Sequence, residues 1–201
     1  MQILFILFFI ILILFIFLAL AYITSMGDGR RLRNFASEMK LELIPGIFPY
    51  RTEVRGNYRG FPVLLFIERK FLGSDSLNIY LTVPSEKNLA LNIHRKILSG
   101  RSICHIPCKP LNTGNVHFDN FFLVESNKPE IIDKILTEDV CRDISTHPWK
   151  GHISLKDDRL HFNMVYNMLE DLSDNTENLI KISNIMVKIA CNISGKEREI
   201  L

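Results

Sequence analysis

The fold class of this 201-residue chain is decided by the segment LNIYLTV, residues 77–83. Apolar and polar side chains alternate along it with a period of two, which is typical of a β-strand with one buried and one polar face. Pro84 follows directly and ends the pattern, because proline cannot donate a hydrogen bond to a sheet. The segment therefore predicts a strand in a sheet that packs one of its faces against a core.

Strand patterns lie on both sides of this segment. The glycine-containing pair Gly56-Asn57 predicts a hairpin between the first two of them, and a turn at residues 156–159 predicts a hairpin between the last two. Residues 99–115 contain several Gly and Pro and predict a loop. The additional strands are expected at residues 52–55, 58–68, 89–93, 118–124, 153–155 and 160–165.

Helical spacing of apolar residues predicts four helices. They are expected at residues 30–40, from Pro129, from Thr137 and at residues 174–195. The last would begin with a capping box from Asp174 to Glu177 and end at Gly195. The connections are too short for repeated βαβ crossovers, so the sequence predicts an α+β domain over residues 30–195, with mainly antiparallel strands and helices packed on one face. Residues 196–201 form a C-terminal tail.

The run ILFILFFIILILFIFLALAYI, residues 3–23, contains no charge or amide. At about 1.5 Å per residue it reaches across a bilayer core of roughly 30 Å, so we expect a transmembrane helix after a short tail at residues 1–2. A cleaved signal peptide is the alternative, and Ala19-Leu20-Ala21 imitates its cleavage site. The length of the run and the missing basic segment before it favour a retained helix. Small residues at 24–29 predict a linker.

Arg30, Arg31 and Arg33 follow the run, and no basic residue precedes it. Basic residues beside a span stay in the cytoplasm, so we expect a single-pass protein of the cell membrane with a cytoplasmic domain; the inverted topology remains an alternative. The same arginines fit a helix lying on anionic lipid headgroups or a helix docked on the domain. A net charge of +2 is too small to indicate a nucleic-acid partner.

Two cysteines in one loop form the most suggestive chemical cluster. Cys104 and Cys108 could bind zinc together with His117 or His105, but a strong zinc signal needs a second matched pair of ligands. The two other cysteines, Cys141 and Cys191, lie in helical patterns, where a free cysteine is usually a small buried residue. Metal binding is therefore an alternative and not the main expectation.

The sequence contains no phosphate-binding loop, dinucleotide-binding glycine pattern, nucleophile elbow or metalloprotease helix. We expect no cofactor, and we expect Asp119 to cap the turn at Thr113-Gly114 rather than to act as an acid. The favoured function is a binding or scaffolding module with an unknown protein partner. The alternative is an anchored enzyme or metal-binding domain with a site near Cys104, Cys108, His117 and Asp119.

Two short motifs carry a family resemblance. Residues 56–63 follow the pattern G-x-Y-x-G-x-x-V, and residues 113–124 follow T-G-N-x-x-F-D-x-x-F-x-V before the helix that opens with Pro129. The chain thereby resembles a loose family of uncharacterised prokaryotic membrane-associated domains over most of residues 30–195, with Asn115 where that family usually has Asp. The resemblance implies a domain placed behind one or two membrane helices, and it implies no activity.

Overall fold

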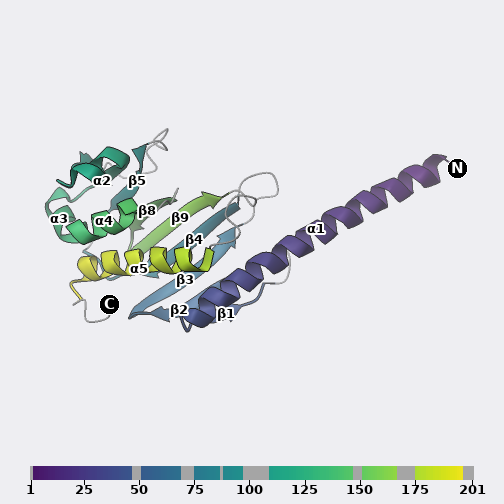
Figure 1. The fold of residues 1–201 in the computed structure, drawn as a ribbon, viewed down its shortest axis with the longest axis horizontal. Coiled ribbons are helices and arrows are strands. Elements are labelled where there is room, and N and C mark those ends of the chain that lie inside the picture. The colour runs from purple at the N-terminus through teal and green to yellow at the C-terminus, as the bar shows by residue number, and fades with distance from the viewer. Residues whose placement is uncertain are drawn as a thin grey trace.

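The computed structural model of the chain (Figure 1) describes residues 2–46, 51–68, 75–86, 88–96, 109–146, 151–166 and 175–196. Its strands are β1 (Glu42–Ile44), β2 (Glu53–Tyr58), β3 (Phe61–Glu68), β4 (Asp75–Thr82), β5 (Leu91–Arg95), β6 (Lys109–Leu111), β7 (Phe122–Ser126), β8 (Gly151–Lys156) and β9 (Arg159–Tyr166). Its helices are α1 (Gln2–Glu38), α2 (Val116–Phe121), η2 (Pro129–Ile131), α3 (Ile132–Ile135), α4 (Glu138–Thr146) and α5 (Asn175–Ser194).

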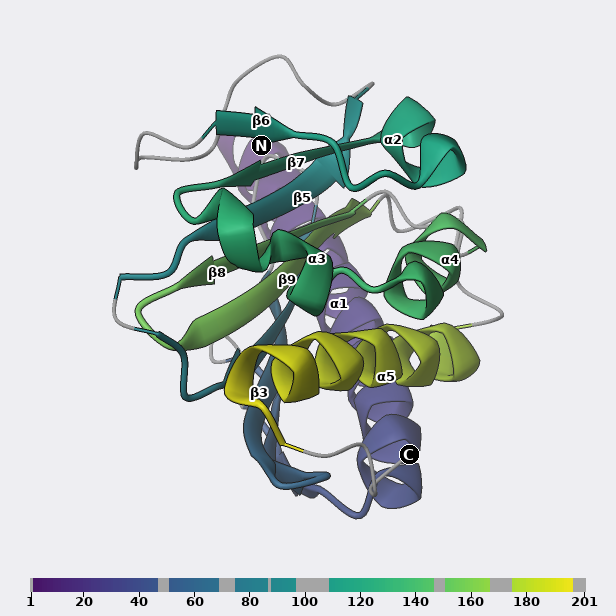
Figure 2. The same ribbon diagram turned by 90° about the vertical axis from the view of Figure 1, so that its left-hand side faces the viewer.

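The strands of the described residues form one nine-stranded sheet in the order β1-β2-β3-β4-β9-β8-β5-β7-β6. Every neighbouring pair is antiparallel. Figure 2 shows α3, α4 and α5 on one side of this sheet. The predicted α+β class is therefore confirmed, with a large antiparallel sheet and helices.

Strand β4 lies between β3 and β9 as a strand of the sheet, but it is not half-buried as its sequence predicts, because Ser76 and Asn78 on its polar face are buried as well. Leu77, Ile79 and Leu81 are buried in the core beneath α5. The long helix α5 contributes its apolar stripe to the same core, and Gly195 ends it with φ 66°. Asp174 of the expected capping box lies outside the described residues.

The first hairpin turns three residues later than its sequence predicts. Tyr58 pairs with Phe61, so the turn is Arg59-Gly60, while Gly56 lies inside β2. Both turn residues have positive φ, 49° and 80°, which is the geometry of a two-residue turn whose twist matches that of the strands. The second hairpin turns at Asp157-Asp158 as predicted, also with two positive φ angles.

The expected strand at residues 118–124 begins only at Phe122, because a short helix precedes it. Asn115 caps this helix, since its Oδ1 accepts a hydrogen bond of 3.0 Å from the backbone N–H of Phe118. The rings of Phe118 and Phe122 stack at 4.9 Å with a helical spacing of four residues. A local cap and this aromatic pair therefore override the strand propensity of the segment.

Helix α1 runs without a break through residues 24–29, where a linker is predicted. Each glycine costs a helix about 1 kcal/mol, which propagation from both sides offsets. At its C-terminal end Leu32, Phe35 and Ala36 are buried in the core, so the docked alternative for residues 30–40 is confirmed. Its continuity makes the docked end and the apolar end one rigid element.

The other end of α1 projects away from the sheet (Figure 1). The side chains from Phe5 to Ile16 are 40–70% exposed. Among the described residues, no helix meets the length and apolarity needed to cross a membrane. The transmembrane helix predicted at residues 3–23 is thus not confirmed by the fold alone.

Candidate functional site

One face of the sheet is polar and lies opposite α5. Cross-strand partners share a face, and the partner chain Leu64, Tyr80, His161, Ser154 runs from β3 through β4 and β9 to β8. The residues between them along each strand point to the core. We call this the polar sheet face; its polar members are Asn78, Tyr80, Asn92, His94, Glu125, His152, Ser154, His161 and Asn163.

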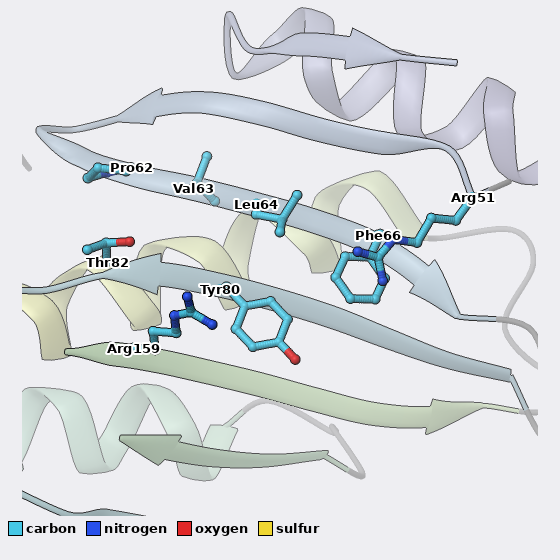
Figure 3. Close-up of a pocket in the computed structure, with 8 residues that line it drawn as sticks. All are labelled: Arg51, Pro62, Val63, Leu64, Phe66, Tyr80, Thr82 and Arg159. Carbon is cyan, nitrogen blue, oxygen red and sulfur yellow. The ribbon is translucent and has the colours of Figure 1, made fainter. Parts of the chain in front are cut away.

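A groove opens on this face with a volume of about 430 Å³. We call it the arginine groove, because a guanidinium group comes from each of two lining residues, Arg51 and Arg159 (Figure 3). The remaining lining is mostly apolar or aromatic. The full set is Arg51, Pro62, Val63, Leu64, Phe66, Tyr80, Thr82 and Arg159.

Arg51 is fixed in place by two contacts. Its guanidinium carbon lies 3.5 Å from the ring centroid of Phe66, and its Nε donates a hydrogen bond of 2.6 Å to Glu53. Arg55 also donates to Glu53. Burial alone raises the pKa of the Glu53 carboxyl, but the two arginines outweigh burial and bring that pKa below its ordinary value. The positive charge that Arg51 brings to the groove is therefore partly balanced by the Glu53 carboxylate.

Arg159 is exposed, as Arg51 is, but the two arginines differ in their partners. Arg159 pairs with Thr82 across β4 and β9, and no ion pair joins it to another residue of the described chain. Figure 3 shows its guanidinium beside the ring of Tyr80. Burial raises the pKa of the Tyr80 hydroxyl, Glu68 raises it further, and the charges of Arg51 and Arg159 oppose both. The groove thus has a spare positive charge at one end.

Tyr80 connects the groove with a row of histidines. Its ring stacks on the imidazole of His161 at 4.1 Å, and His161 Nε2 lies 3.0 Å from Asn78 Oδ1. Asn163 Nδ2 donates to the same oxygen at 2.8 Å. Burial, with a contribution from His152, lowers the pKa of His161 to about 4. The imidazole is therefore neutral at pH 7 and donates from Nε2 to the amide oxygen.

The histidine row continues onto β8 and β5. His152 is the cross-strand partner of His94, and burial followed by the nearness of His94 lowers the pKa of His152. Asn92 Nδ2 donates to Glu125 Oε2 at 3.0 Å, while the buried Asn92 Oδ1 has no hydrogen-bond partner within the described part of the chain. Among the described residues, no three His, Cys, Asp or Glu side chains are placed to hold a metal ion. Asn92, His94 and Glu125 are buried while His152 and His161 are partly exposed, so the row is a hydrogen-bonded layer that reaches solvent only in part.

The residues that sequence reasoning selected lie elsewhere. Cys104 and Cys108 are outside the described residues. His117 is exposed on α2, where its ring meets that of Phe121 edge-on at 5.3 Å. Asp119 accepts the backbone N–H and the hydroxyl of Thr113, at 3.1 and 2.9 Å, which confirms the expected turn cap.

Two further expectations concern cysteines and arginines. Cys141 and Cys191 are buried thiols outside any disulfide, as predicted, and burial raises the pKa of Cys141 to about 11, so it is a poor nucleophile. Arg33 is exposed on α1. The side chains of Arg30 and Arg31 lie outside the described residues.

Neither the groove nor the histidine row is predicted by the sequence. His94, His152 and His161 are far apart in the sequence. Each nevertheless stands at a polar position of a strand in which polar and apolar residues alternate. That alternation is visible in the sequence. What the sequence lacks is the strand order, which places β9 beside β4 and β5 beside β8.

No protein-family model matches the chain, and no curated protein matches it in sequence. A similar fold occurs in the crystal structure of the mycobacterial trehalose monomycolate transport factor A, TtfA. The two chains are 14% identical with a TM-score of 0.59, and the match covers 87% of this chain and 96% of that one. At this identity the likeness establishes a shared fold across nearly the whole of both chains.

Proposed function

We propose that the chain is a membrane-anchored binding module, in which α1 fixes the α+β domain to a bilayer and the polar sheet face binds a partner or ligand. One observation carries the proposal: α1 is a single helix with two different ends. Phe35 at one end is buried in the domain core, while Phe5 to Ile16 at the other are exposed. A row of apolar side chains on a rigid helix is costly in water and favourable in lipid.

The sequence adds support for the anchor. Residues 3–23 carry no charge, and Arg30, Arg31 and Arg33 follow them on the side of the domain. This arrangement supports a cytoplasmic domain beside anionic lipid headgroups. The anchored protein would thus hold its polar sheet face near the inner surface of the cell membrane.

The fold shared with the trehalose monomycolate transport factor supports an accessory role in lipid transport. The polar sheet face suits binding better than catalysis, because its histidines contact amides and aromatic rings. In such a role the domain would hold a lipid or a transport protein in place at the membrane.

Alkaline extraction of membranes tests the anchor. We expect the full chain to stay in the membrane pellet, and the double variant Ile10→Asp with Leu14→Asp to move to the supernatant, because each charge costs a membrane helix about 2.5–3.5 kcal/mol. Val116→Asp is the matched control, since Val116 is 74% exposed but lies on α2. Extraction of the unchanged chain would overturn the proposal.

A further inference from the structure

We infer that the arginine groove binds an anionic amphiphile, a molecule with a phosphate or carboxylate head and an apolar tail. The inference rests on the proposed function, since a bilayer is the natural store of such molecules. It names the ligand class of the polar sheet face. Three features of the groove carry it: its size, its spare charge and its apolar floor.

The size suits a small ligand. A volume of about 430 Å³ falls within the roughly 300–1,000 Å³ of small-molecule sites. The groove lies over the central strands β3, β4 and β9, away from the helices that cover the other face (Figure 3). Its lining residues come from rigid strands, except for Arg51 just before β2.

The charge selects an anion. Arg51 and Arg55 share the single carboxylate of Glu53, and Arg159 has no ion-pair partner among the described residues. Nearby Glu68 is turned toward Ser76, whose hydroxyl lies 3.5 Å from its Oε2. Arg159 therefore keeps its whole charge at its end of the groove, where the hydroxyl of Thr82 is the adjacent cross-strand partner. A guanidinium with a neighbouring hydroxyl is a good receptor for phosphate or carboxylate oxygens.

The floor selects an apolar tail. Leu64 pairs with Tyr80 across β3 and β4, and Pro62 continues the same face toward the Arg59-Gly60 turn of the first hairpin. Leu64 and Tyr80 are only partly buried, so a tail laid over them would remove apolar surface from water. The guanidinium of Arg51 over Phe66 closes the other end. An inorganic ion would leave this floor unused.

Calorimetric titration of the full chain in phosphatidylcholine nanodiscs tests the inference, with hexyl phosphate as the ligand and empty nanodiscs as the blank. We expect saturable binding that is at least about tenfold tighter than binding of inorganic phosphate or hexanol. Arg159→Gln should weaken it about tenfold. Lys156→Gln is the matched control, because Lys156 is the exposed cross-strand partner of Arg159 but does not line the groove; its affinity should stay within about twofold.

A second variant separates head from tail. Leu64→Thr keeps a strand-forming residue but removes apolar surface from the floor of the groove. The affinity for hexyl phosphate should therefore fall toward that for inorganic phosphate. Equal binding of hexanol, equal weakening by Arg159→Gln and Lys156→Gln, or no saturable binding would each overturn the inference. A chain that resists alkaline extraction yet binds no hexyl phosphate refutes the ligand class and leaves the anchor standing.

Discussion

The ring of Tyr80 lies parallel to the imidazole of His161, with centroids 4.1 Å apart and planes inclined by 2°. The two residues are cross-strand partners on β4 and β9. Tyr80 also lines the arginine groove, whereas His161 begins the histidine row. The pair therefore joins the arginine groove to the hydrogen-bonded row of histidines on one face of the sheet.

This pair predicts a pH dependence of stability. The pKa of His161 is about 4 in the fold and about 6.5 in an unfolded chain. As the pH falls below 6.5 the unfolded chain takes up the proton first, so stability is lost between pH 6.5 and 4. Partial exposure of the ring keeps the slope below the ~1.4 kcal/mol per pH unit of one fully differential proton.

Thermal unfolding in nonionic detergent at several pH values measures this slope. His161→Phe keeps a ring over Tyr80 and removes the titration, so its melting temperature should depend less on pH than that of the unchanged chain. The variant keeps some dependence because the pKa of His152 is also lowered. Identical slopes in the two proteins would show that His161 does not titrate as described.

Docking of α1 predicts a large effect at Phe35. Its side chain is 1% exposed, so Phe35→Ala removes a core aromatic and should cost about 3–5 kcal/mol of unfolding free energy. The neighbouring Asn34 is exposed, and Asn34→Ala should change stability by less than about 0.5 kcal/mol. A loss at Phe35 as small as that at Asn34 would mean that the end of α1 is not part of the core.

Gly151 lies so close to the ring of Phe162 that a substitution at one position should be partly compensated by a substitution at the other. A Cβ at Gly151 would lie 2.4 Å from Cε2 of Phe162, so Gly151→Ala should destabilise the domain by about 1–3 kcal/mol. The same substitution in a Phe162→Leu background should cost less. Relief stays partial because the backbone oxygen of Asn163 also lies within 2.8 Å of that Cβ. Additive losses would argue against the contact.

The turn at Thr113 predicts that Asp119 matters for stability. Its carboxylate accepts two groups of Thr113, and Asp119→Asn places an amide N–H against one of those donors, which should cost about 1–2 kcal/mol. His117→Ala, on the exposed side of the same helix, should be nearly neutral in thermal unfolding. The reverse order of effects would reopen the idea of a functional site at these two residues.

Local patterns predicted much of the fold. The strand at β4, the turn at Asp157-Asp158 and the apolar stripe of α5 each depend on neighbours in sequence, and each is present as expected. The burial of Asn78 on the polar side of β4 depends on the rest of the fold and was not predicted. The hairpin at Arg59-Gly60 was misplaced because Gly56-Asn57 is an equally good turn signal by composition. Pairing of Tyr58 with Phe61 across the sheet settles the register, and a short sequence pattern does not contain it.

The candidate site was harder to predict because it is a product of strand order. Arg159 and Arg51 are distant in sequence, and both line one groove because β9 is the neighbour of β4 in the sheet. Strands β5 to β8 lie between β4 and β9 along the chain, so the sequence does not show this neighbourhood. By contrast, His117 and Asp119, which the sequence predicts as site candidates, are close in sequence. Asp119 caps the turn at Thr113, so a local structural role accounts for it. Local density of reactive residue types was therefore a poor guide.

The most direct test of an anchored binding module is photo-crosslinking from the polar sheet face in native membranes. A photoreactive residue at Thr82 lies in the groove, and one at the exposed Lys181 lies on α5, away from that face. We expect an adduct with a membrane lipid or transport protein from Thr82, none from Lys181, and loss of the Thr82 adduct when Ile10→Asp and Leu14→Asp release the anchor. Equal adducts from both positions, or a Thr82 adduct that survives release from the membrane, would contradict this prediction.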